Sequence, residues 1–232
     1  MPQVPPPGAV SLTAKEAEKC LLDQLAATKD NPAQAMWMLG NSYKQAGQVD
    51  KATEYFNRLL ETAENLETRA QLIFSLGQTA EKMEDYALAA DFYRHALAHE
   101  PTDKFHWYFI HNNLGYSLVQ LGDFDEAQKF CRAAIQIDPE RSNAHKNLGL
   151  AYQGQGRDRE AAECFVAATQ ANASDARDLG LLEALLMEHP DLEFDFASQL
   201  ECCRKAVEVA ARERERALEE IKRRDRQKPS SP

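Results

Sequence analysis

The sequence predicts an all-α solenoid, a stack of antiparallel helix pairs. The main observation is a pattern that recurs after 34 residues: 111–116 reads HNNLGY and 145–150 reads HKNLGL. Gly122 and Gly156 follow these segments at the same interval and mark the turn inside each pair. A period near 34 with an early Leu-Gly and a central Gly turn is typical of helix–turn–helix repeats. Each pair leaves an apolar face uncovered, so neighbouring pairs must stack.

The sequence contains four such repeats, each with a small residue in its first helix. They are expected at about 33–66, 70–103, 108–141 and 142–173. Their starts lie 37, 38 and 34 residues apart, so the first two intervals contain extra residues. A longer helix or a wider loop would absorb them, and Asp103 is placed to N-cap an early start of the third repeat. Glu84 stands at an inter-helix turn where Gly is usual, which predicts a positive φ at a non-Gly residue.

The spacing and residue types of these repeats resemble the tetratricopeptide repeat (TPR) family. The resemblance implies a right-handed superhelix in which the first helix of each pair lines a concave surface. Gly115 and Ala127 would lie where the helices of one pair cross, because small side chains let backbones approach. The matching positions of the second helices are expected to face the next repeat; they are Phe56, Tyr93, Cys131 and Phe165.

The two ends of the chain differ from the repeats. Residues 1–12 are rich in Pro and predict a disordered tail, followed by an N-terminal capping helix within 13–31. Residues 174–227 predict C-terminal helices, of which the last runs from about Phe196 to Arg224 and becomes highly charged. Residues 228–232 predict a second disordered tail.

Composition and charge exclude several classes of function. The formal net charge is −10, and residues 201–232 carry +3, which leaves −13 for residues 1–200. An acidic body argues against nucleic acid as a partner. No apolar run is long enough to span a bilayer and no export signal is visible, so we expect a cytoplasmic protein without membrane contact.

Cysteine and histidine spacing gives no reason to expect a metal or a cofactor. The five cysteines include no CxxC spacing, so neither a disulfide framework nor a zinc site is predicted. Cys202 and Cys203 are interpreted as an ordinary helical pair rather than a redox pair. His95 and His99 are interpreted as a surface pair because no HExxH context accompanies them.

The resemblance implies a peptide-binding groove made by the first helices. Its expected residues, carried over position by position, are Trp37, Asn41, Phe74, Gln78, Phe109, Asn112, Asn113, Tyr116, Asn143, Lys146 and Asn147. Exposed aromatic rings would anchor apolar side chains, and amide groups would pair with a peptide backbone whatever its sequence. The alternative is that the insertion or the terminal helices bury the aromatic rings.

One specific function of the family can be tested on the residues. Chaperone-binding members hold an acidic chain terminus with a carboxylate clamp of Lys and Asn, then Asn, then Lys and Arg. If the clamp begins at repeat one, only Asn41 matches, because Trp37, Ser75, Phe109 and Asn113 occupy the other positions. Binding of an acidic chaperone tail is therefore not expected.

The leading hypothesis is a protein-interaction adaptor or scaffold that binds an extended peptide or helix of unknown identity. The alternative is a structural or assembly protein that self-associates through its C-terminal helix as a homo-oligomer. An enzyme is not expected, because the sequence has no phosphate loop, no nucleophile elbow and no candidate catalytic residues.

Overall fold

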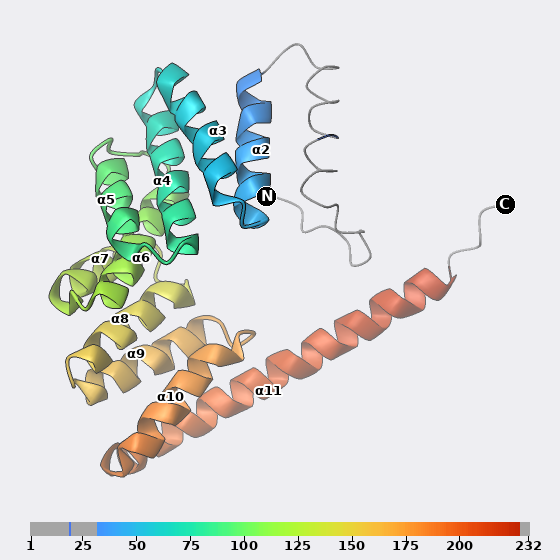
Figure 1. Ribbon diagram of the computed structural model, residues 1–232. Helices are drawn as coiled ribbons and strands as arrows, with labels where there is room; N and C mark the ends of the chain where they lie inside the picture. Colours follow the sequence, from blue (N-terminus) through green and yellow to red (C-terminus); the bar gives the residue numbers. More distant parts are fainter. Residues whose placement is uncertain (1–18, 20–31, 228–232) are drawn as a thin grey trace. The chain divides into compact units, whose positions relative to one another are not determined.

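The computed structural model describes residue 19 and residues 32–227 of the 232-residue chain (Figure 1). This part consists of α-helices joined by short turns, with no strand in it, which confirms the predicted all-α class. Apart from residue 19, which is helical, the predicted capping helix at 13–31 and both predicted tails lie outside the described residues. The chain forms two compact units, Met1–His106 and Trp107–Pro232.

Unit 1 consists of two antiparallel helix pairs in sequence order. Its helices are α2 (Pro32–Gln45), α3 (Val49–Thr62), α4 (Leu66–Lys82) and α5 (Tyr86–Leu97). Each helix packs on the next one along the chain. The apolar faces of the first three helices form one buried cluster: Leu39, Tyr43, Ala52, Phe56, Leu59, Leu72 and Leu76.

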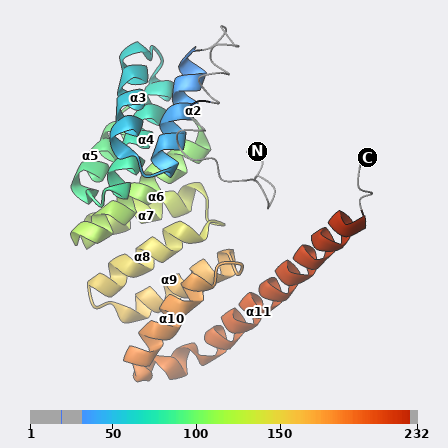
Figure 2. The same ribbon diagram turned by 45° about the vertical axis from the view of Figure 1, so that its right-hand side comes forward.

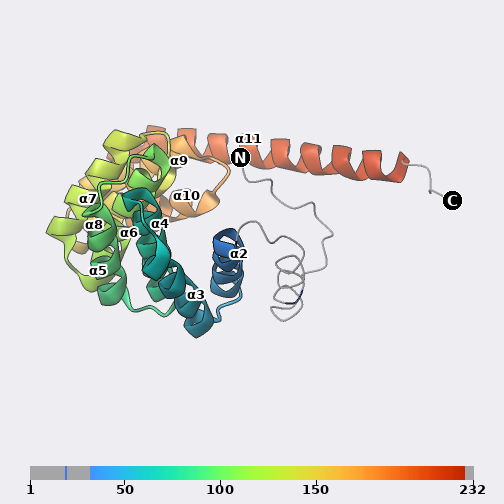
Figure 3. The ribbon, with the colours of Figure 1, turned by 90° about the horizontal axis from the view of Figure 1, so that it is seen from above.

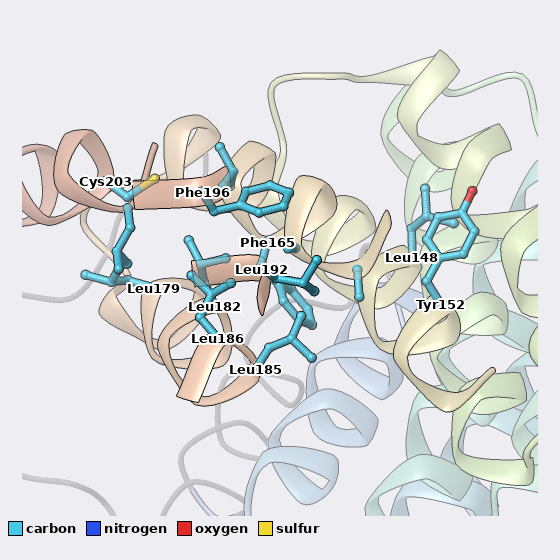
Figure 4. Close-up of a cluster of buried hydrophobic side chains, with 14 of the residues drawn as sticks. Leu148, Tyr152, Phe165, Leu179, Leu182, Leu185, Leu186, Leu192, Phe196 and Cys203 are labelled. Atoms are coloured by element: carbon cyan, nitrogen blue, oxygen red, sulfur yellow. The ribbon is translucent and has the colours of Figure 1, made fainter. Parts of the chain in front are cut away.

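Unit 2 is also built of antiparallel helix pairs in sequence order (Figure 2). Its helices are α6 (Lys104–Leu121, whose first turn belongs to unit 1), α7 (Phe124–Ile137), α8 (Ser142–Gly154), α9 (Asp158–Ala171), α10 (Ala176–Glu188) and α11 (Pro190–Gln227). Figure 4 shows the core of the last two pairs, where the leucines of α10 meet Leu192 and Phe196 of α11. The apolar face of α10 and the apolar face of α11 therefore pack together and close the C-terminal end of unit 2.

Glycine and an aromatic ring meet inside most helix pairs. A Cβ added at Gly40 would lie 2.7 Å from the ring of Phe56, and one at Gly149 would lie 2.6 Å from Phe165. In the α6–α7 pair the partner is Cys131, whose Sγ would lie 2.5 Å from a Cβ on Gly115. The predicted close crossing is confirmed, because that Cβ would also lie 3.4 Å from the Ala127 carbonyl. These second-helix residues were expected to face the next repeat. Phe56 does belong to the buried cluster with Leu72 and Leu76 of the next pair, and its ring also meets the glycine of its own pair.

The extra residues between repeats lengthen the first helices. α4 has 17 residues and α6 has 18, compared with 14 in α2 and 13 in α8. Asp103 Oδ1 accepts from the His106 amide at 3.0 Å, which confirms the predicted N-cap of α6. Glu67 secures the preceding loop to α4 by accepting from the amide of Thr102 at 2.7 Å.

The last helix begins earlier and runs further than the sequence predicts. α11 begins at Pro190 rather than near Phe196, because a proline at the first helical position gives up an amide that would be unpaired there anyway. Its first half is buried on α9 and α10 through Leu192, Phe196, Leu200 and Cys203. From residue 211 to 224 every side chain is exposed, and this half leaves the body of unit 2 as a straight rod (Figure 3).

Candidate functional site

The candidate site is built on the first helix of each pair, α2 and α4 in unit 1 and α6 and α8 in unit 2. Side chains three or four positions apart on a helix share one face. Trp37, Asn41 and Lys44 therefore share a face of α2, while Gln71, Gln78 and Lys82 are placed on one face of α4.

Trp37 and Asn41 lie together on α2. The Trp37 ring is half-buried and meets Phe56 edge-on, with ring centroids 5.7 Å apart. Asn41 Nδ2 donates to the Trp37 carbonyl at 3.0 Å. One amide hydrogen of Asn41 is thus used inside the helix, and the half-exposed tryptophan ring is the larger contact surface.

The Phe74 ring is buried, whereas the sequence analysis expected it to be an exposed ring of the groove. Its side chain is only 7% exposed. The ring contacts Tyr93 at a centroid distance of 5.7 Å and meets His106 edge-on at 6.5 Å. His106 comes from the insertion before the third repeat, which is the alternative that the sequence left open for the aromatic rings. Phe74 therefore supports the core rather than offering a ring to a partner.

Gln78 accepts a hydrogen bond from Lys44 across α2 and α4. The distance from Lys44 Nζ to Gln78 Oε1 is 2.6 Å, and the ammonium group lies 5.8 Å from the centre of the Phe56 ring. Burial, followed by the charge of Lys82, lowers the pKa of Lys44 to about 8, while Glu81 opposes this shift.

A cavity of about 520 Å³ opens beside Trp37 at the N-terminal ends of α2 and α4. Trp37, Leu59, Ala63 and Leu72 supply apolar wall, and Gln71 is one of its polar lining residues. The end of α3 closes the back of this cavity, because Leu59, Thr62 and Ala63 belong to the last turn of α3 and the residue after it. Its size and lining suit a bulky apolar side chain with amide groups nearby.

In unit 2 the predicted asparagines form a chain of amides between α6 and α8. Asn147 Nδ2 donates to Asn112 Oδ1 at 3.1 Å, and Asn112 Nδ2 donates to Asn113 Oδ1 at 3.0 Å. Asn112 and Asn147 are buried, and Asn113 is half-buried. Asn147 Oδ1 is buried and has no hydrogen-bond partner among the residues that the structure describes. A buried acceptor without a donor is unfavourable, so Asn147 has a cost in stability beneath this surface.

Phe109 and Tyr116 flank the amides on α6, and both are half-buried. The Arg141 guanidinium lies 5.0 Å from the centre of the Phe109 ring and 5.2 Å from that of Tyr108. Arg141 Nε also donates to Asp138 at 2.7 Å, which holds the guanidinium in place over the rings. The Phe109 ring therefore already contacts a cation of the chain itself, the Arg141 guanidinium.

Asn143 and Lys146 lie on α8, exposed and half-buried respectively. Nearby on α10 is Asp178, a carboxylate that is only 1% exposed. Burial raises the pKa of Asp178, while the charge of Lys146 and the Ser142 hydroxyl act in the opposite direction. Asn143 and Lys146 thus form a polar surface on α8, and Asp178 of α10 is a buried acid close to it.

Two thiols in this part of unit 2, Cys131 of α7 and Cys164 of α9, are packing groups. Burial raises the pKa of Cys131 and of Cys164 to about 12. Both stay protonated near neutral pH and pack as small apolar groups.

Comparison with known proteins decides the family. The model of the tetratricopeptide repeat family matches residues 15–99 and 109–174, which is more than half of the chain. The chain belongs to the tetratricopeptide repeat family. The match covers all of the helix pairs from α2 to α9 except the start of α6.

Individual relatives agree with this family. Human tetratricopeptide repeat protein 7B is 29% identical over 175 residues, a stretch that covers 72% of this chain but only 20% of that protein. The chain thus spans about a fifth of the length of this relative. Among solved structures, MamA (41-end) from Desulfovibrio magneticus RS-1 is similar with a TM-score of 0.58 at 16% identity, covering 78% of this chain and 96% of that one. YrrB, a TPR protein with an unusual peptide-binding site, is similar with a TM-score of 0.55 at 24% identity, covering 72% and 83%. These two likenesses show the fold.

Three features of the site are absent from the sequence-based prediction. The cavity depends on how the end of α3 meets α2 and α4, the Lys44–Gln78 contact joins two repeats, and Arg141 lies over Phe109 from a loop. Lys44 and Gln78 stand 34 residues apart, one repeat length, and that spacing was the signal that could have paired them.

None of the helices in the described part combines the length and the apolar character needed to cross a membrane.

Proposed function

We propose that this TPR protein is a non-catalytic adaptor that binds a protein partner as an extended segment or a helix. The observation that carries the proposal is the partly exposed face of α6, where the half-buried Asn113 lies on the same helix as the half-buried rings of Phe109 and Tyr116. Asn147 orients these amides from below, because it donates to Asn112, which donates to Asn113. An amide side chain such as that of Asn113 can pair with a peptide backbone of any sequence.

The other predicted residues fit the same proposal with separate roles. In unit 1, Trp37 would contribute apolar contact area, and Asn41 and Gln78 would contribute polar contacts. In unit 2, Tyr116 would contribute apolar contact area, and Asn143 and Lys146 would contribute polar contacts. Phe74 would act only by supporting the surface from below, because its ring is covered. Affinity would come from the aromatic anchors and orientation from the amides.

Affinity capture followed by mass spectrometry tests this function. The native chain is compared with a Phe109→Ala/Asn147→Ala double variant and with Lys129→Ala as a control, since Lys129 is exposed on α7. We expect the double variant to lose partners that both the native chain and the control retain. Thermal melting checks that the double variant is folded. An unchanged set of partners from a folded double variant would contradict the proposal.

A second candidate is self-association through α11, and its exposed half favours it. Leu218 and Ile221 are 43% and 45% exposed, on the segment 211–224 in which every side chain is exposed. Apolar residues three positions apart on such a rod gain by meeting a second helix. Light scattering on the native chain and on Leu218→Glu/Ile221→Glu tests this. A monomeric mass for both proteins would remove the candidate.

A further inference from the structure

Lys44 is a cation that lacks an anionic partner. It lies in the last turn of α2, half-buried against the Phe56 ring, and its hydrogen bond goes to the neutral amide of Gln78. Within the described residues no carboxylate forms an ion pair with Lys44 or with Lys82. The nearby charges are Lys82 and Glu81, and the lysine has the larger effect. A half-buried ammonium group with these surroundings is stabilised when an anion joins it.

The three polar groups lie together. Gln78 and Lys82 are four residues apart on α4 and share its face, so the Lys82 stem lies one turn from the Lys44–Gln78 contact. Since the Gln78 oxygen accepts from Lys44, the amide nitrogen of Gln78 is a further donor at this point. Two ammonium groups and an amide donor suit a carboxylate. The chain as a whole has a net charge of −10, so this cluster of two lysines is a local region of positive charge.

The cavity beside Trp37 lies on the same two helices, toward their N-terminal ends. Ala33 and Trp37 line it, and they precede Lys44 by eleven and seven residues of α2. At 1.5 Å per residue the cavity lies roughly 10–16 Å from the lysine. An extended chain covers that distance in about three to five residues at ~3.3 Å each. Of separations of three, four and five positions, only four places both side chains on the same side of the extended segment.

We propose that unit 1 recognises an extended segment that carries a large apolar residue and an acidic residue four positions apart. The apolar side chain fills the Trp37 cavity, and the acidic side chain pairs with Lys44, Lys82 and the Gln78 amide. This inference rests on the proposed function and specifies the chemistry of the partner. The acid belongs to a side chain rather than to a chain terminus, because Trp37 and Ser75 stand where the terminal-carboxylate clamp of the family needs Lys and Asn.

Short fluorescent peptides and the full chain test the proposal. Acetylated, amidated peptides in a Gly/Ser background carry one Leu and one Glu, in either order and two to six positions apart. Binding is followed by fluorescence anisotropy and by the tryptophan emission of a Trp107→Phe chain, in which Trp37 is the remaining tryptophan. We expect the tightest binding at a separation of four and a loss of about fivefold when Glu becomes Gln. A peptide with a free terminal carboxylate in place of the Glu side chain should bind no better than the Gln peptide.

Protein variants assign the effect to the lysines. Lys44→Gln and Lys82→Gln should each reduce the difference between Glu and Gln peptides, and Lys44→Arg should restore it. Lys104→Gln is the matched control, because Lys104 is exposed at the start of α6 and should behave as the native chain. Thermal melting confirms that each variant is folded.

The outcomes separate this inference from the proposed function. Peptides that bind regardless of Glu, or of its distance from Leu, would overturn the two-point recognition and leave peptide binding standing. The absence of binding by any peptide at millimolar concentration would overturn the inference for unit 1. The capture experiment with the Phe109→Ala/Asn147→Ala variant would still decide the adaptor function independently.

Discussion

Glu84 shows at the scale of one residue where the chain keeps an unfavourable conformation. Its φ is +59°, in a turn whose counterparts are glycines, Gly47 at +71°, Gly122 at +81° and Gly156 at +71°. The positive φ predicted from the sequence is confirmed. A side chain costs about 1 kcal/mol in this region, whereas glycine adopts it freely.

Glu84→Gly is therefore expected to stabilise the protein. The gain should be about 0.5–1 kcal/mol, since relief of the left-handed conformation exceeds the added entropy of the unfolded chain. Gly122→Ala is the reciprocal variant and should destabilise by a similar amount. Urea denaturation of both variants measures these effects. A loss of stability in Glu84→Gly would contradict this explanation.

Lys44 gives a second prediction at the residue scale, and it depends on pH. In the folded chain its pKa is lowered from 10.5 to about 8 by burial and by Lys82, so between pH 8 and 10.5 the unfolded state binds more protons than the folded one. Stability therefore rises with pH in this window, and at neutral pH the charged lysine destabilises the fold.

Lys44→Met should be more stable than the native chain at pH 7, by roughly 1–3 kcal/mol after allowance for partial exposure. The difference should shrink as the pH rises from 8 toward 10.5, because the native lysine loses its proton. Urea denaturation of both proteins at several pH values provides the measurement. A difference that stays constant with pH would show that the lysine is not destabilised by its charge. Retention of an unfavourable lysine is consistent with a role in binding an anion.

At the scale of the element, the helix pairs are held at a short distance by glycine. The ring of Phe165 occupies the space that a Cβ on Gly149 would take, and Tyr93 does the same at Gly77 with a contact of 2.5 Å. Glycine within a helix costs about 1 kcal/mol relative to alanine, and the close packing of a large ring offsets that cost. In the α6–α7 pair a cysteine replaces the ring, and a Cβ on Gly115 would lie 3.3 Å from its backbone nitrogen.

Ala127→Leu is expected to force α6 and α7 apart. Ala127 is fully buried and its carbonyl lies beside Gly115, so the added side chain has no space. We expect a loss of about 1–3 kcal/mol. Thermal melting measures it, with Ala87→Leu as the control because Ala87 is exposed on α5. Equal melting temperatures for Ala127→Leu and the native chain would refute the crossing assigned here.

At the scale of the whole molecule, the chain is two compact units, each with its own buried cluster. In a stack of repeats each pair contacts only its neighbours, so stability is local. Damage to the core of unit 1 should therefore leave the far end of unit 2 protected.

Phe56→Ala tests this independence. Phe56 is fully buried in the unit 1 cluster, and its loss should destabilise that cluster by about 3–5 kcal/mol. Hydrogen exchange measured by mass spectrometry should become faster in α2 to α5 and stay unchanged in α8 to α10. Equal acceleration throughout the chain would indicate one cooperative unit instead.

The amino-acid sequence was sufficient to predict the helix pairs, their order and the family. The Leu-Gly positions, the turn glycines and the Asp103 cap are local signals that repeat, and each acts within a few residues of the chain. It also determined which helices carry the candidate site, because the face of a helix follows from its period.

Which residues of that face are exposed could not be predicted, because it depends on contacts between helices. Phe74 is covered by His106 from an insertion, Phe109 shares its ring with Arg141, and Asn147 is left with a buried acceptor. The Lys44–Gln78 contact and the cavity at Trp37 join helices from different repeats. Such contacts depend on how far neighbouring helices approach, a distance set by side-chain volumes across the interface. The period of the sequence fixes the direction in which a side chain points, and the packing of its neighbours fixes what it meets there.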